Sequence, residues 1–311
     1  MKVNILLAAY NGERFIKEQI ASIQAQDFSD WTLLVRDDGS SDHTRQIVQA
    51  LSPDDSRIRL IDAERHDNLG VIASFYRLLK YEEADYYFFS DQDDVWLPHK
   101  LSHSLNAAKN HDKSQPLMVY TDLKVVDQEL TVVHDSMIRT QSHHANTTLV
   151  QELTENTVTG GTMMINHALA MMWQRPDNLL MHDWYLALLA TSFGQLVYLD
   201  EATELYRQHD HNVLGARTWS KRIRNWGRPH RLVAKYWWLI KASQKQAKML
   251  LDQPLRQEDR QLVTAFVTLM DQTFLQRYRI LKQYQLRKNR WFHTFIFRSL
   301  ILTKFGYRRS E

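Results

Sequence analysis

The sequence predicts an α/β protein, with a doubly wound, mostly parallel sheet in the first two thirds and a C-terminal helical appendage. Apolar runs and helical patterns alternate along the first hundred residues, as in βαβ proteins. The runs are nearly continuous, which is typical of parallel strands buried on both faces. The balance of charge then changes sharply, which predicts domains at 1–215 and 216–311.

The predicted elements follow one another closely. "VNILLAAY" predicts a strand over 3–10, and apolar residues spaced three and four apart predict a helix within 12–26. Residues 31–51 repeat this strand and helix, with Ser41 or Asp42 placed to cap the helix. The later strands and helices are predicted, in order, within 57–63, 71–84, 85–94, 116–127, 156–169, 182–194 and 195–209.

Composition excludes several classes of protein. The absence of cysteine excludes thiolate chemistry, sulfur-bound zinc and disulfides, and it fits the cytoplasm. Neither a signal peptide nor a run of about 18 apolar residues is present, so we expect no membrane span. Residues 1–210 carry 17 Lys and Arg against 31 Asp and Glu, whereas residues 211–311 carry 22 against 5. Halves of opposite charge suggest two roles.

Polar clusters follow three of the predicted strands, at 10–12, 37–40 and 91–94. The carboxyl ends of parallel strands meet at one edge of a sheet, so we expect a ligand site there. In "SDQDDVWLPHKL", Asp91, Asp93 and Asp94 repel one another unless a cation joins them, and carboxylate oxygens suit Mg²⁺ or Mn²⁺. The alternative is that Asp93 and Asp94 only cap a helix that begins near Pro98.

The segment "RDDGSSD" has two interpretations. Asp37 and Asp38 are suited to accept hydrogen bonds from the base or ribose of a nucleotide, because a carboxylate is a strong acceptor. Asp-Gly-Ser also forms turns and helix caps, and Gly12 and Gly39 suit tight turns. Neither glycine belongs to a P-loop or a G-x-G-x-x-G pattern, so the sequence does not support an ATPase or a dinucleotide-binding protein.

In order and spacing, "AAYNGERF", "RDDGSSD", "DQDD" and "MHDW" resemble the motifs of family 2 glycosyltransferases. The resemblance covers about residues 1–215 and implies the GT-A fold, a Rossmann-like nucleotide-sugar domain. "SDQDDVWLPHKL", "TGGTMMIN", "HDWYLALLATSFG" and "LYRQHDHN" are similar, more narrowly, to bacterial rhamnosyltransferases of cell-surface and cell-wall polysaccharide synthesis. That narrower resemblance implies dTDP-β-L-rhamnose as the donor and an α-L-rhamnoside as the product.

The resemblance also implies roles for individual residues. Those implied to bind the nucleotide sugar are Ala9, Tyr10, Glu13, Asp37, Asp38 and Asp91. Asp93, with Asp91, is implied as a ligand of Mn²⁺ or Mg²⁺. Asp183 is implied as the catalytic base that takes the proton of the acceptor hydroxyl. Asp183 also suits the N-terminus of its helix, where a lower pKa would weaken it as a base. The family often has Glu-Asp here, whereas this chain has His182 before Asp183.

Other residues near these motifs keep two interpretations each. Arg207 and His209 bind the diphosphate or complete the metal shell, or else they lie in a solvated loop. Gly161, with Gly160, lets the backbone approach the donor sugar or the acceptor closely, or forms a plain turn. Trp96 either stacks on a sugar or packs close to the site.

The C-terminal region is basic and rich in aromatic residues. From His211 to Leu251 ten Lys and Arg occur without an acidic residue, and residues 229–251 have the spacing of an amphipathic helix. We expect residues 216–311 to bind an anionic membrane surface, where cations and aromatic side chains are favourable. Homo-oligomerisation through these helices is the alternative. Nucleic acid is not an expected partner, because no DNA- or RNA-binding module is recognisable and the first half is acidic.

Together these patterns predict an inverting, metal-dependent glycosyltransferase. It would move a sugar, L-rhamnose by the narrower resemblance, from a nucleotide diphosphate to a hydroxyl of a lipid-linked glycan at the inner face of the cell membrane. The alternatives are a UDP-sugar-dependent member of the same family and a non-catalytic protein of this fold that binds nucleotide or carbohydrate. A nucleotidyltransferase would carry an N-terminal Gly-rich phosphate loop, which this chain lacks.

Overall fold

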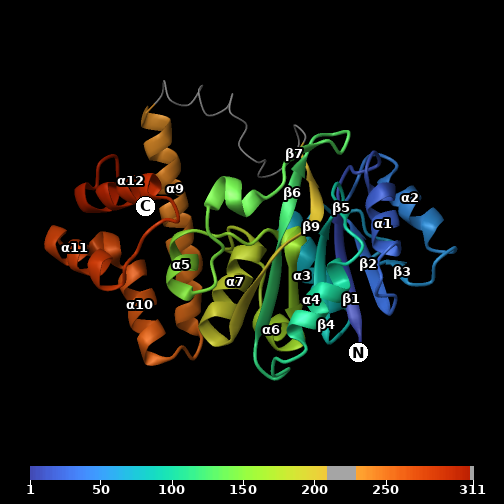
Figure 1. The fold of residues 1–311 in the computed structure, drawn as a ribbon, viewed down its shortest axis with the longest axis horizontal. Coiled ribbons are helices and arrows are strands. Elements are labelled where there is room, and N and C mark those ends of the chain that lie inside the picture. Colours follow the sequence, from blue (N-terminus) through green and yellow to red (C-terminus); the bar gives the residue numbers. More distant parts are fainter. Residues whose placement is uncertain (209–228, 309–311) are drawn as a thin grey trace.

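The centre of the molecule is one sheet, seen in a computed structural model that describes residues 1–208 and 229–308 (Figure 1). Its nine strands are β1 (Val3–Ala9), β2 (Trp31–Asp37), β3 (Ile58–Leu60), β4 (Tyr86–Asp91), β5 (Val95–Trp96), β6 (Leu117–Val126), β7 (Val132–His134), β8 (Met163–Asn166) and β9 (Gln195–Arg207). The order is β3-β2-β1-β4-β8-β6-β9-β5, with β7 paired to β6. Only β5, β7 and β8 among the described strands run antiparallel to their neighbours. The prediction of a mostly parallel sheet is confirmed.

Helices cover both faces of the sheet. One face carries α1 (Ile16–Gln24), α2 (Thr44–Leu51) and α4 (Lys100–Ala108). The other face carries α3 (Val71–Tyr81), α5 (Leu149–Thr154), α6 (His167–Met172) and α7 (His182–Phe193). Side chains alternate across a strand, so Ile5 and Leu7 pack in the first layer whereas Leu6 packs in the second. This double coverage explains why the strands read as continuous apolar runs.

The predicted elements are largely present, with local differences. The helix after Pro98 begins at Lys100, and residues 195–207 form one strand. The short strands β5 and β7 were not predicted, because two or three residues carry no periodic signal. His43, not Ser41 or Asp42, precedes the first residue of α2, while Asp42 accepts the backbone N–H of Thr44 at 2.9 Å.

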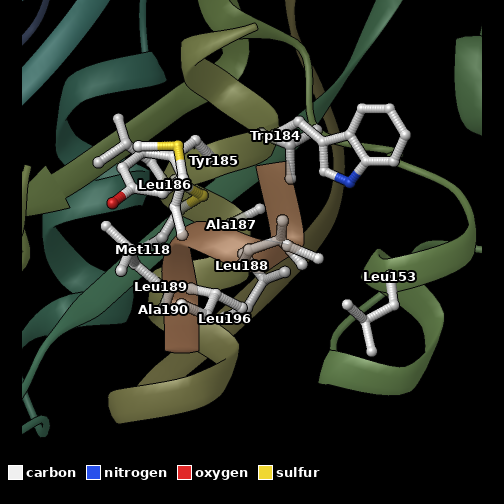
Figure 2. Close-up of a cluster of buried hydrophobic side chains, with 14 of the residues drawn as sticks. Met118, Leu153, Trp184, Tyr185, Leu186, Ala187, Leu188, Leu189, Ala190 and Leu196 are labelled. Atoms are coloured by element: carbon white, nitrogen blue, oxygen red, sulfur yellow. The ribbon is translucent and has the colours of Figure 1, made fainter. Parts of the chain in front are cut away.

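In the part of the chain that the structure describes, four α-helices follow residue 228. They are α9 (Pro229–Lys248), α10 (Gln257–Val267), α11 (Phe274–Gln283) and α12 (Trp291–Thr303). Tyr236, Trp237 and Ile240 of α9 are buried in the same hydrophobic cluster as α5 and α7. In Figure 2 the side chains of α7 gather against Met118 and Leu196 of the sheet, with Leu153 of α5 across from them. Core packing thus joins the C-terminal helices to the sheet.

The predicted domain boundary between residues 215 and 216 lies outside the described residues and stays a prediction. In the described segments we find no helix with both the length and the apolarity needed to cross a bilayer.

Candidate active site

The three polar clusters meet at one edge of the sheet, as predicted. Ala9, the last residue of β1, pairs with Asp37 at the end of β2. Ala8 pairs with Asp91 at the end of β4. The parallel register therefore brings the carboxylates of β2 and β4 to the two sides of the β1 end.

Hydrogen bonds between the loops fix this edge. The side chain of Gln92 accepts the Tyr10 N–H and donates to the Tyr10 carbonyl, each at 2.8 Å. The Asn11 N–H donates to Ser40 Oγ at 2.9 Å. Gly39 has a φ of 79°, and a Cβ added there would lie 2.7 Å from the His66 carbonyl oxygen. Glycine is required at this turn for both reasons.

The two acids that end β2 have different environments. Asp38 accepts hydrogen bonds from the buried Arg36 guanidinium and from the N–H groups of Leu69 and Gly70, at 2.7 and 2.8 Å for the two amides. Its oxygens therefore hold the loop before α3. Asp37 accepts the Ser40 N–H at 3.3 Å through one oxygen, while its buried Oδ1 has no protein partner. Asp37 is thus the better placed acceptor for a ligand.

The other residues expected around a nucleoside line the same side of the edge. Tyr10 is half exposed, which leaves its ring free to stack on a base. Ala9 is buried, and its carbonyl accepts the Asp38 N–H at 2.7 Å. Glu13 accepts hydrogen bonds from the backbone N–H and ring of His43, which lower the pKa of this carboxyl. Glu13 therefore lies at the rim and shapes the loop.

Three acids gather after β4, as the sequence indicated. Burial, together with the negative charges of Asp93, Glu204 and Asp183, raises the pKa of Asp91 to about 8. Asp94 is fully buried, and burial with Glu204 and Asp93 raises its pKa well above the ordinary value. Its Oδ2 has no hydrogen-bond partner. Carboxyl groups that are costly to ionise because they are buried close together favour the binding of a cation.

A buried ion pair lies behind these acids. Lys100, the first residue of α4, donates to Glu204 Oε2 and to the Gly161 carbonyl, each at 2.5 Å. Both charged side chains are fully buried. The ammonium also lies 4.5 Å from the ring centre of Trp96, which is buried as core. Burial lowers the pKa of Lys100, and the carboxylates of Glu204, Asp94 and Asp91 oppose that shift.

Gly161 belongs to a short 3₁₀ turn, Gly160–Thr162, that lies over this ion pair. A Cβ added to Gly161 would lie 2.7 Å from Glu204 Oε1, so the close approach of backbone to carboxylate requires glycine. The group approached is a protein carboxylate, so a close approach of this backbone to the donor sugar or the acceptor stays a prediction.

Arg207 supports the acidic turn. Its N–H donates to Asp94 Oδ1 at 3.1 Å, and its guanidinium donates to the Asp93 carbonyl at 3.0 Å and to Glu18 at 2.5 Å. These bonds make Arg207 a positioning residue for the acids, and its direct contact with a diphosphate stays a prediction. His209 lies outside the described residues.

Asp183 lies in the first turn of α7 and is nearly fully buried. Its Oδ1 accepts the Trp184 N–H at 2.6 Å, as expected near a helix N-terminus. Burial outweighs this hydrogen bond and that of Asn156, and it raises the pKa of Asp183 to about 7. The helix terminus lowers the pKa, as expected, but the depth of burial, which was not predicted, raises it more. A carboxylate with a pKa near neutrality is well suited to accept a proton.

His182 and Glu152 are buried beside this base. The ring of His182 packs against Phe75, Phe89 and Trp173, and neither ring nitrogen has a hydrogen-bond partner. Burial lowers its pKa to about 3, so the imidazole is neutral. The fully buried carboxyl of Glu152 has its pKa raised well above the ordinary value by burial. We therefore expect the imidazole of His182 to be uncharged at neutral pH, while burial disfavours the charged form of Glu152.

The acids fit a divalent cation only in part. In the described segments no three His, Asp or Glu side chains are close enough to hold a metal by themselves. Asp91 and Asp93 offer one or two carboxylate oxygens, which is how Mg²⁺ is commonly held when phosphate oxygens and water supply the remaining ligands. The donor set therefore suits an ion that arrives with a diphosphate.

Sequence reasoning missed Lys100, Glu204 and Glu152. Lys100 lies within "SDQDDVWLPHKL", Glu204 directly precedes "LYRQHDHN", and Glu152 belongs to no quoted motif, but nothing in these segments indicates that the charged side chains are buried. The only available signal was a charge at a strand position, such as Glu204, whose neighbours along the strand read as buried.

The sheet order and its flanking helices define a GT-A glycosyltransferase fold. The family described as Glycosyl transferase family 2 matches this chain over residues 4–174. The chain therefore belongs to family 2 of the glycosyltransferases.

Two relatives illustrate the range of sequence similarity. A dTDP-rhamnosyl transferase of Shigella flexneri, RfbG, is 29% identical over 220 residues, which are 68% of this chain and 74% of the relative. The UDP-Glc:alpha-D-GlcNAc-diphosphoundecaprenol beta-1,3-glucosyltransferase WfgD of Escherichia coli is 39% identical over 99 residues, 32% of this chain and 38% of the relative.

Two solved structures share the fold. TarS 1–349 of S. aureus in complex with UDP-GlcNAc aligns with a TM-score of 0.59 at 16% identity, over 99% of this chain and 93% of that chain. The mannosyltransferase PcManGT of Pyrobaculum calidifontis, in complex with GDP-Man and Mn²⁺, aligns with a TM-score of 0.56 at 14% identity, over 90% and 73%. At these identities the likeness shows the fold alone.

Proposed function

We propose that this family 2 glycosyltransferase transfers a sugar, with inversion, from a nucleotide diphosphate to a hydroxyl of a growing bacterial polysaccharide. The observation that carries the proposal is Asp183, a buried carboxylate with a pKa of about 7 that lies close enough to Asp91 to raise the pKa of that acid. A proton acceptor next to a cluster of acids is the arrangement that such a transfer needs.

In the proposed step, Asp183 takes the proton of the acceptor hydroxyl while the hydroxyl oxygen attacks the anomeric carbon of the donor sugar. The bond from that carbon to the diphosphate breaks, and the nucleoside diphosphate leaves with the bonding electron pair. Asp37 accepts a hydrogen bond from the nucleoside, and Tyr10 stacks on the base. Asp93 and Asp91 would hold Mg²⁺ or Mn²⁺, which when bound neutralises charge on the diphosphate.

We further propose dTDP-β-L-rhamnose as the donor. Support comes from RfbG, described as a dTDP-rhamnosyl transferase and aligned over 68% of this chain. A UDP-sugar is the second candidate, because WfgD is described as using UDP-Glc. For the acceptor we propose a lipid-linked glycan at the inner face of the cell membrane, since WfgD and a Campylobacter jejuni relative are both described as acting on undecaprenol-linked sugars.

A donor screen tests this proposal. The full chain is incubated with Mg²⁺ or Mn²⁺, a set of nucleotide sugars and a lipid-linked acceptor, and release of nucleoside diphosphate is measured. We expect turnover with dTDP-rhamnose, and a loss of at least about a hundredfold in kcat for Asp183→Asn with donor affinity retained. Turnover with UDP-sugars alone would overturn the rhamnose assignment. Donor binding without turnover on any acceptor would make the chain a binding protein.

A further inference from the structure

Helix α12 has an outer face that the fold leaves uncovered. Trp291, Phe292 and Phe295 are 81%, 48% and 65% exposed, although they are among the most apolar side chains of the protein. Phe295 follows Phe292 and Trp291 by three and four residues, spacings that bring side chains together on a helix. The ring centres of Trp291 and Phe292 are 5.9 Å apart. The opposite side of α12, with Phe297, Leu300 and Ile301, is packed in the core. We call Trp291, Phe292 and Phe295 the α12 aromatic face.

The segment of the sequence that contains this face carries only positive charge. Between Gln272 and Ser310 the sequence has ten Lys and Arg and no Asp or Glu. Arg290 directly precedes the face, and Arg287, whose side chain is exposed, lies three residues before Arg290. Figure 1 shows α11 and α12 at the end of the molecule opposite α1 and α2, so the acidic half does not surround them.

We infer that the α12 aromatic face docks on an anionic lipid bilayer. Aromatic rings settle at the boundary between headgroups and acyl chains, and Lys and Arg beside them are attracted by anionic headgroups. A second copy of the chain fits less well, because a symmetric contact would bring two surfaces of the same positive charge together. The inference rests on the proposed function only for the lipid-linked acceptor.

The inferred membrane contact lies on α12, and not on the helix that the sequence indicated. The amphipathic pattern of residues 229–251 was the sequence signal for such a surface. In the fold, however, Tyr236, Trp237 and Ile240 on the apolar side of α9 are buried. Tyr236 hydrogen-bonds to His293 of α12, and Trp237 donates to the Phe305 carbonyl at 2.8 Å. That side is therefore core, and α12 offers the exposed one.

A short series of contacts joins the α12 aromatic face to the catalytic base. Just before the face, Lys288 donates to the Thr154 carbonyl, and the Asn289 N–H donates to Glu155 Oε2 at 2.9 Å. The next residue along that segment, Asn156, hydrogen-bonds to Asp183. The α12 aromatic face is thus linked to Asp183 through residues 154–156.

Helix α9 also forms hydrogen bonds with the segments next to Asp183. Gln246 of α9 is fully buried, and its Oε1 accepts the Leu180 N–H at 2.9 Å and the Met181 N–H at 3.4 Å, directly before the first residue of α7. Ser243 donates to the Leu153 carbonyl at 2.6 Å. Helix α9 therefore helps to fix the positions of α5 and of the residues directly before α7.

Sedimentation with vesicles, without donor or acceptor, tests the inference. Binding of the full chain is measured on vesicles of phosphatidylethanolamine with phosphatidylglycerol and on vesicles of phosphatidylcholine. We expect binding to the anionic vesicles that weakens with salt, and a partition coefficient at least about tenfold lower for the triple variant Trp291→Gln, Phe292→Gln, Phe295→Gln. Tyr81→Gln is the matched control, because Tyr81 is a 52% exposed aromatic that precedes Glu82 and Glu83.

Further measurements decide between the outcomes. Arg287→Gln with Arg290→Gln should weaken binding and reduce its salt dependence, since fewer cations meet the headgroups. Unchanged binding of a folded triple variant would overturn the inference. A triple variant that binds vesicles normally but loses a dimer in light scattering would make this face a subunit interface. Binding is read without substrates, so a failure of glycosyl transfer leaves this result unaffected.

Discussion

The ion pair of Lys100 and Glu204 gives the sharpest test of how the site is held together. The change is Lys100→Met, which keeps the length of the side chain and removes its charge. In the native protein the ammonium binds Glu204 and the Gly161 carbonyl, and both charged side chains are fully buried. The variant leaves the Glu204 carboxylate without its cation.

The structure sets the size of the effect. Removing one partner of a fully buried ion pair costs about 3–5 kcal/mol, because the remaining charge stays out of water. Replacing both partners costs much less, so Lys100→Met with Glu204→Gln should be more stable than the sum of the two single changes by about 2 kcal/mol or more. For a chain of this size, the single change should lower Tm by about 5–8 °C.

The assay is urea denaturation of the wild type, the two single variants and the double variant, followed by tryptophan fluorescence at one pH. The four unfolding free energies form a double-mutant cycle, whose coupling energy reports the pair alone. A coupling below about 0.5 kcal/mol, or a loss below about 1 kcal/mol for Lys100→Met, would show that the two charges are not buried together, and the argument would fail.

Three further predictions follow from the same site. kcat should rise about tenfold per pH unit below about pH 7 and level off above it, because Asp183 acts only when deprotonated; a flat profile, measured with saturating donor, would contradict this. His182 stays neutral in the folded chain to about pH 3 but binds a proton near pH 6.5 when unfolded, so acid favours unfolding. His182→Leu should reduce the fall in the urea unfolding free energy between pH 6 and 4 by about 1.4 kcal/mol per pH unit. Parallel plots of this free energy against pH for the variant and the wild type would refute the prediction. Gly161→Ala should lower the free energy of unfolding by about 1–3 kcal/mol in thermal denaturation, because the added Cβ meets Glu204. The loss should exceed that of Gly160→Ala, whose Cβ would lie 3.3 Å from His182. Equal losses would count against the prediction.

The sheet and its polar edge were predictable because their signals are local. Strands buried on both faces must be apolar throughout, and residues that follow parallel strands must share one edge. The positions of Asp37, Asp91 and Asp93 at that edge follow from these two facts alone, and the register confirms them for Asp37 and Asp91.

The finer distribution of roles depends on tertiary contacts. Asp37 and Asp38 are neighbours of identical type, and only the fold shows that Asp38 is occupied by Arg36 and by the backbone before α3. Lys100 and Glu204 are 104 positions apart, so no local pattern joins them. For Asp183 the sequence revealed the helix terminus, which lowers a pKa, but not the depth of burial, which raises it more.

The core shared by the sheet and the C-terminal helices limits how relatives of this enzyme can be recombined. A chimera that joined residues 1–208 to the helices of another relative would place foreign side chains against α5 and the start of α7, where Ser243 and Gln246 of α9 now bind the Leu153 carbonyl and the Leu180 N–H. Mismatched packing of that kind costs several kcal/mol. The C-terminal helices are thus expected to change in evolution together with α5 and α7, and not as an exchangeable module.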